Sequence, residues 1–166
     1  QTAASLGELA EGVSVSPGVM GPFDYSVSRY GIKDTSNTDV LWYAGDLVTL
    51  WYNAGDPCCL DGRTLDTRSQ FQLQGRPTSR MSAHSKVDWN TGELLFFDYG
   101  DEPPYLTYGV ADSSGKLLHE VAIDLPGPRL PHDIGFTSRY AIVHDLPLFH
   151  DMNVLRKHNY RVLTFH

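Results

Sequence analysis

The fold is decided by a stretch that reads SKVDWNTGELLFFDY, residues 85–99. Its two ends are separated by Trp89-Asn90-Thr91-Gly92, and Gly92 supplies the backbone freedom that a tight turn requires. The run over 94–99 is rich in aromatic residues, which suit a pleated surface. The stretch therefore predicts a β-hairpin with strands over 85–88 and 94–99.

The same alternation of short apolar runs and turn residues continues on both sides. Further strands are predicted around turns at 44–46, 61–63, 112–115 and 138–139, over 40–43, 47–52, 58–60, 105–110, 117–123, 140–144 and 160–165. Hairpin after hairpin without a helical crossover indicates an all-β fold and excludes a doubly wound sheet. Helices are few and short, over 2–11 and over 152–157 after Asp151.

A weak recurrence at about 45 to 50 residues fits one four-stranded propeller blade per period. On that scale the chain provides about three blades, and a β-sandwich is the alternative that fits the same pattern. Three blades cannot close a propeller, and the chain neither begins with Met nor continues past its last predicted strand. We therefore expect a fragment: one partial domain over 1–166.

The composition is that of a globular protein, with 41% apolar and 20% charged residues among 166. The net charge of −7 and the scattered basic residues argue against a nucleic-acid partner, because phosphate binding needs clustered Lys and Arg. The chain has no apolar run of about 18 residues that could cross a membrane. Its first residues also lack the pattern of a signal peptide.

Cys58 and Cys59 are adjacent and are the only cysteines. Vicinal cysteines rarely bridge each other, so a disulfide framework is excluded and a reducing compartment, the cytoplasm, is expected. The spacing also does not fit a cysteine metal site. We interpret the pair as two small residues on a strand.

Histidines are the natural candidates for chemistry, since imidazole is the commonest metal ligand near neutral pH. His84 and His132 each precede a predicted strand, and they lie 48 positions apart at equivalent places of neighbouring sheet units. They are the candidate metal ligands, although isolated histidines are more often structural and the pattern alone leaves both roles open. Surface positions are expected for the remaining histidines that can be judged, His119, His144, His150 and His158.

Four strings, in order over about residues 30–150, resemble motifs of the carotenoid cleavage oxygenases. This is the retinal pigment epithelial membrane protein family, which includes lignostilbene dioxygenases and the retinoid isomerase of vision. The string KDTSNTDV at 33–40 resembles an Asn-Thr strand entry, and LDGRTLDT at 60–67 resembles a D-P-x-T-L-E-T turn. AHSKVD with TGEL, at 83–88 and 91–94, resembles A-H-P-K-x-D…T-G-E-L. LPHDIGFT with DLP, at 130–137 and 145–147, resembles H-D-x-x-x-T…D-L-P.

The resemblance implies a seven-bladed β-propeller with a non-haem Fe(II) on its axis, held by four histidines from different blades. His84 and His132 match the first two ligands, and the other two are expected beyond the end of this chain. Asp133 is expected to support the local turn. The implied reaction is the cleavage of a conjugated C=C bond by O2 into two carbonyl products. The partners would be a small lipophilic polyene or stilbene and O2, with peripheral membrane contact outside these residues.

The chain departs from the family near Trp51. Members usually carry there a Glu that accepts the second ring N–H of a ligand, and stilbene-cleaving members add a Lys, but residues 50–55 read LWYNAG. This weakens a lignostilbene assignment, and the aromatic residues suggest an apolar polyene as a hypothesis. Two alternatives stay open, a catalytically incomplete fragment or divergent homologue, and a β-propeller binding module.

Overall fold

The computed structural model describes residues 36–51, 56–73, 76, 77 and 81–165, together with Ala10 and Gly12. The chain divides into two compact units, which are described separately. One is Thr35–Pro147, and the other combines Gln1–Asp34 with Leu148–His166.

The larger unit begins with a four-stranded antiparallel sheet whose strands follow chain order. Its strands are β1 (Asp39–Tyr43), β2 (Asp46–Leu50), β3 (Cys58–Leu60) and β4 (Thr67–Gln70). Tyr43 pairs with Asp46, so only Ala44 and Gly45 form the turn, and both have positive φ. Two such residues are what a two-residue hairpin turn requires. The predicted hairpin over 40–52 is confirmed.

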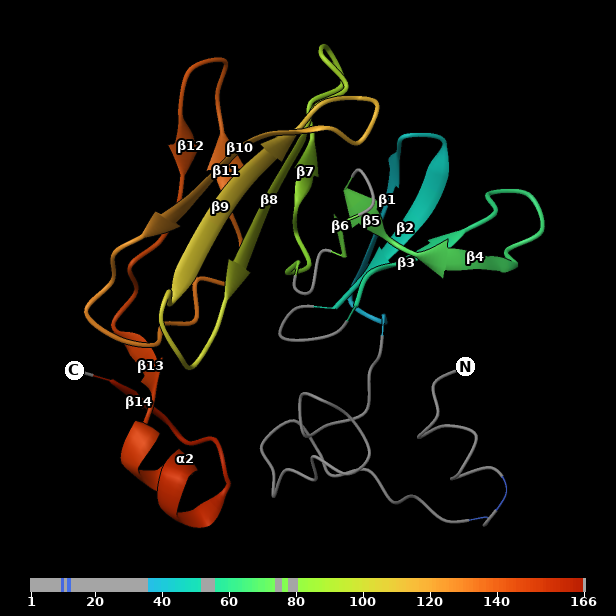
Figure 1. Ribbon diagram of the computed structural model, residues 1–166. Helices are drawn as coiled ribbons and strands as arrows, with labels where there is room; N and C mark the ends of the chain where they lie inside the picture. The colour runs from blue at the N-terminus through green and yellow to red at the C-terminus, as the bar shows by residue number, and fades with distance from the viewer. Residues whose placement is uncertain are drawn as a thin grey trace. The chain divides into compact units, whose positions relative to one another are not determined.

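A second four-stranded antiparallel sheet also follows chain order (Figure 1). It contains β7 (Lys86–Val87), β8 (Leu94–Tyr99), β9 (Leu106–Ala111) and β10 (Leu117–Ile123). The predicted hairpins β7–β8 and β9–β10 are confirmed, although β7 is shorter than expected. Strand β7, the first of this sheet, contacts β1, the first strand of the other.

Strand β8 is the centre of the larger unit because both of its faces are buried. Leu94 and Phe96 belong to a cluster with residues of the first sheet, including Val48 and Leu50. Leu95 and Phe97 point the other way, into a second cluster that contains Ile134. Because side chains alternate along a strand, an uninterrupted apolar run such as LLFF places a strand between two apolar layers.

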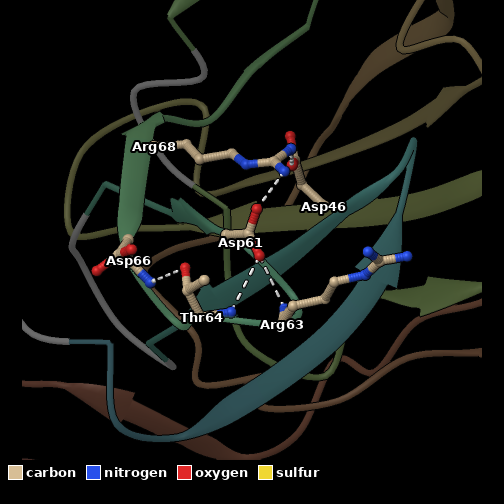
Figure 2. Close-up of polar contacts among 6 residues, drawn as sticks. All are labelled: Asp46, Asp61, Arg63, Thr64, Asp66 and Arg68. Carbon is tan, nitrogen blue, oxygen red and sulfur yellow. Dashed lines mark hydrogen bonds and ion pairs between the residues drawn. The ribbon is translucent and has the colours of Figure 1, made fainter.

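Arg68 of β4 links β2 and the turn after β3 through two carboxylates (Figure 2). Its guanidinium lies 2.6 Å from Asp46 Oδ1 and also bonds Asp61 in the predicted turn. The backbone N–H groups of Arg63 and Thr64 donate to the other Asp61 oxygen, at 2.8 and 3.0 Å. The N–H of Arg63, the Arg68 guanidinium and the N–H of Thr64 together lower the pKa of Asp61 to about 2. This network is structural and lies on an exposed surface.

The remaining strands form two-stranded ladders. They are β5 (Gln72–Leu73) with β6 (Arg76–Pro77), β11 (Gly135–Phe136) with β12 (Ala141–Ile142), and β13 (Leu148–His150) with β14 (Leu163–Phe165). Helix α2 (Met152–His158) begins after Asp151, whose side chain accepts the N–H groups of Asn153 and Val154. The helix predicted over 152–157 is thus confirmed. The one predicted over 2–11 lies, apart from Ala10, outside the described residues.

The described residues are therefore mostly antiparallel β-sheet with one short helix, as predicted. The assignment to propeller blades and the single-domain boundary stay predictions. Among the described residues no helix is long and apolar enough to span a membrane.

Candidate metal centre

The backbone that leads into His84 is held between the two sheets. The Ser82 N–H donates to the carbonyl of Phe97 in β8 at 2.8 Å, and the Ala83 N–H donates to the carbonyl of Trp51 at 3.1 Å. Ser82 also forms a parallel bridge with Trp51, directly after β2. Since Ser82 and Ala83 are buried and fixed on both sides, the position of His84 is set by the cores of the unit.

Asp39 orients the ring of His84. Its Oδ2 accepts the backbone N–H of His84 at 3.2 Å and lies 3.5 Å from Nδ1 of the same residue. A metal-binding histidine commonly turns one ring N–H toward a carboxylate, which fixes its tautomer. The arrangement therefore leaves Nε2 of His84 as the nitrogen for a metal, and the side chain is 30% exposed.

His132 lies in a loop between two buried residues, Pro131 and Ile134. The following residue, Asp133, donates its N–H to the carbonyl of Pro131 and accepts the N–H of Ile134 at Oδ1, at 2.7 Å. The same oxygen receives the ammonium of Lys86 at 2.7 Å. Burial raises the pKa of Asp133, but the hydrogen bonds from Lys86 and Ile134 outweigh it and lower the pKa below its usual value.

The two histidine rings meet although 47 residues of chain separate them. Their centroids are 5.1 Å apart and their planes are inclined at 59°. With metal–nitrogen bonds of about 2.1 Å, two imidazoles on one ion at an angle near 100° have ring centres roughly 5 Å apart. The pair fits two ligands of one metal ion. Neutral imidazole is a donor that suits iron, copper, nickel and zinc.

Both candidate ligands have a left-handed backbone. The φ angles are 65° at His84 and 41° at His132, and three other non-glycine residues of the described ranges share a positive φ. Such a conformation costs about 1 to 2 kcal/mol per residue and concentrates at functional sites. Both histidines therefore adopt an energetically unfavourable backbone conformation, and their rings lie close together.

The other histidines of the described residues differ in their burial. His119, His144 and His158 are exposed, as predicted, whereas the prediction for His150 is wrong. His150 ends β13, pairs with Leu163 and is only 7% exposed, because the stretch taken as polar loop forms a strand that turns this side chain inward. Among the described residues no group of three or more His, Cys, Asp and Glu could hold a metal ion. His166 lies outside those residues.

The cysteines take the predicted structural place in β3. Burial raises the pKa of the Cys59 thiol, which disfavours the thiolate that a metal would need.

The contact of Asp39 with His84 and the Lys86–Asp133 pair were not predicted from the sequence. These residues lie inside the quoted family strings, but their contacts join segments more than 40 positions apart, and no local pattern carries that information. At the position of the expected carboxylate, Trp51 is buried, and residues 52–55 lie outside the described ranges.

Comparison with known proteins identifies the family of the chain. The model of the retinal pigment epithelial membrane protein family matches residues 1–166. The isoeugenol monooxygenase of Pseudomonas nitroreducens is 32% identical over 81% of the chain and 29% of its own length. The carotenoid 9,10(9′,10′)-cleavage dioxygenase 1 of Arabidopsis thaliana is 36% identical over 73% of the chain and 23% of its own length.

Solved structures share the fold. The lignostilbene dioxygenase of Pseudomonas brassicacearum superposes with a TM-score of 0.80 at 32% identity, over 94% of this chain and 33% of that one. A cobalt-substituted apocarotenoid oxygenase of Synechocystis has the same fold at a TM-score of 0.74 and 23% identity. The chain thus spans about a quarter to two fifths of the length of the relatives and structures it matches.

Proposed function

The chain belongs to the retinal pigment epithelial membrane protein family, and from that membership we propose that its gene product is a non-haem Fe(II)-dependent dioxygenase. The proposed reaction cleaves one conjugated C=C bond of a carotenoid, apocarotenoid or stilbene. Each carbon of that bond receives one oxygen atom of O2, so that two carbonyl products form. The relatives named as dioxygenases act on carotenoids and lignostilbenes, which supports this substrate class.

The approach of His84 and His132 carries the proposal. We assign both side chains as iron ligands, with Nε2 of His84 as one donor because Asp39 lies beside Nδ1. When bound, iron with imidazole ligands supplies open coordination positions at which O2 and an electron-rich double bond can react. His84 and His132 would hold the ion as two of its donors, and further histidines from other blades would complete the set.

The protein's own contribution is to hold the two imidazoles in fixed positions, through the buried backbone before His84 and the carboxylate of Asp39 beside it. Trp51 is buried where the backbone of Ser82 joins the first sheet, so the segment that leads into His84 is anchored in the core. We propose that this geometry is repeated around a seven-bladed propeller, of which the two four-stranded meanders are blades. The cytoplasm is the proposed location.

The test is to purify the full-length gene product with Fe(II) and to compare wild type with His84→Ala, His132→Ala and the control His119→Ala. We expect each ligand variant to lose most of its iron and its O2-dependent cleavage, while the control on exposed β10 retains both. Iron per protein is read by metal analysis, and carbonyl products are read from a carotenoid and a lignostilbene. Full iron content in both ligand variants would refute the assignment.

A further inference from the structure

Lys86 and Asp133 form the one described ion pair that links the two segments carrying the candidate ligands. Lys86 opens β7, two positions after His84, and Asp133 directly follows His132. The ammonium nitrogen lies 2.7 Å from Asp133 Oδ1. We propose that this pair is a positioning device that sets the separation of the two imidazoles. The proposal deepens the proposed function and rests on it.

Each end of the pair is anchored to something rigid. Lys86 pairs with Leu95 of β8 in the sheet register, so its backbone moves with the central strand. Asp133 is held by its own turn, because its Oδ1 also accepts the Ile134 N–H and its N–H donates to Pro131. A bond between two anchored residues fixes the His132 loop relative to β7, which a bond between mobile residues cannot do.

The Lys86–Asp133 ion pair contributes little to the stability of the fold. The side chains of Lys86 and Asp133 are 33% and 50% exposed, and ion pairs of this exposure contribute little to the free energy of folding. A left-handed His132 beside a short turn, by contrast, needs an external contact to hold its orientation. The role of the pair is therefore to hold His132 in position relative to His84. Removal of groups that support metal ligands lowers metal affinity about 10- to 100-fold.

The direction in which Lys86→Met changes metal affinity distinguishes a positioning role from a purely electrostatic one. Lys86 is a cation near the proposed iron, so its charge alone opposes metal binding, and Lys86→Met would tighten binding if charge were all that mattered. If Lys86 positions His132 through Asp133, the same substitution weakens binding. Asp133→Asn weakens binding under either account, so it serves to measure coupling.

The experiment titrates the metal-free full-length protein with Co(II), read by visible absorption, and measures Fe(II) retention. We expect Lys86→Met and Asp133→Asn each to raise the Co(II) dissociation constant about tenfold, and the double variant to be no weaker than the worse single variant. The Co(II) spectrum of both variants should shift relative to wild type, since the ligand geometry changes. Asp46→Asn, which breaks the comparable surface pair with Arg68, is the matched control and should change neither readout (Figure 2).

Three results would overturn the inference: unchanged or tighter Co(II) binding in Lys86→Met, losses that multiply in the double variant, or an equal loss in the control. If Lys86→Met does not fold, as judged by circular dichroism, Lys86→Gln takes its place with the same expectation. A protein in which wild type and His84→Ala retain metal equally would refute the proposed function instead. The two failures are therefore distinguishable.

Discussion

Gly109 offers the sharpest test of how tightly the central strand is packed. It pairs with Phe96 across β8 and β9, and the Phe96 ring lies directly over its Cα. A Cβ added at position 109 would lie 2.2, 2.6 and 2.7 Å from three carbons of that ring. Phe96 is only 4% exposed and belongs to the core cluster between the two sheets, so the ring has no free space to enter. Gly109→Ala must therefore displace either the ring or the strand.

The expected cost follows from this geometry. Overpacking a filled core by a methyl group lowers the free energy of unfolding by about 1 to 3 kcal/mol. Because three contacts fall below van der Waals distance, Gly109→Ala should cost about 3 kcal/mol. Phe96→Leu alone costs about 1 to 2 kcal/mol because it leaves a small cavity. In the double variant the smaller side chain makes room for the methyl group, so the loss should fall about 1 to 2 kcal/mol short of the sum. Denaturant unfolding of the full-length product, followed by circular dichroism, measures these values.

Gly127→Ala is the matched control, since no atom lies within 4 Å of the added Cβ and its φ is not in the left-handed region. It should change stability by less than about 0.5 kcal/mol. A Gly109→Ala variant that is as stable as wild type would refute the packing argument. Strictly additive losses in the double variant would show that the ring and the methyl group do not meet.

Two further predictions concern the contacts that join distant segments. Tyr43→Phe removes a hydroxyl that donates to the carbonyl of Asp112, and it should cost about 1 kcal/mol at pH 7. Burial, together with the nearby charge of Asp112, raises the pKa of Tyr43 from 10.0 to about 12. The neutral hydroxyl therefore contributes its full share to the free energy of unfolding below pH 10, and this contribution is lost as the pH rises from 10 to 12. Denaturant midpoints at pH 7 and 11 should show that Tyr43→Phe has a smaller alkaline loss than wild type; equal losses would contradict the assignment. Asp39→Ala should weaken Co(II) binding about tenfold by freeing the His84 ring, and an unchanged dissociation constant would remove Asp39 from the site.

The sequence predicted the hairpins well because their signals are local. Gly92 and Gly115 mark turns with positive φ, and the predicted strands beside them pair as antiparallel hairpins. Strand β4 was missed because its residues, TRSQ, are all exposed and carry no apolar alternation. It forms only because β3 offers an open edge for hydrogen bonding. Whether a polar segment forms an edge strand depends on the strand it pairs with, and the segment's own sequence does not contain that information.

The two candidate metal-binding histidines could be predicted from the sequence, whereas the residues that hold them in position could not. His84 and His132 were singled out by their places before strands and by the motifs around them, and the structure brings their rings together. Their role as ligands stays a prediction. Asp39 reaches His84 across 45 positions of chain, and Lys86 reaches Asp133 across 47, so both contacts depend on the tertiary fold. His150 shows the opposite error, in which a polar residue was assigned to the surface although a strand buries it.

The backbone at the two histidines argues for a role beyond structure. Glycine would adopt φ of 65° and 41° without cost, whereas histidine at each position costs about 1 to 2 kcal/mol. The opposite faces of β8 offset that cost, because Ala83 packs in the cluster on one face and Ile134 in the cluster on the other. A fold that needed only tight turns here would be more stable with glycine at both places. The presence of two imidazoles instead, with centroids 5.1 Å apart, is explained if the ring nitrogens do something that the backbone does not need.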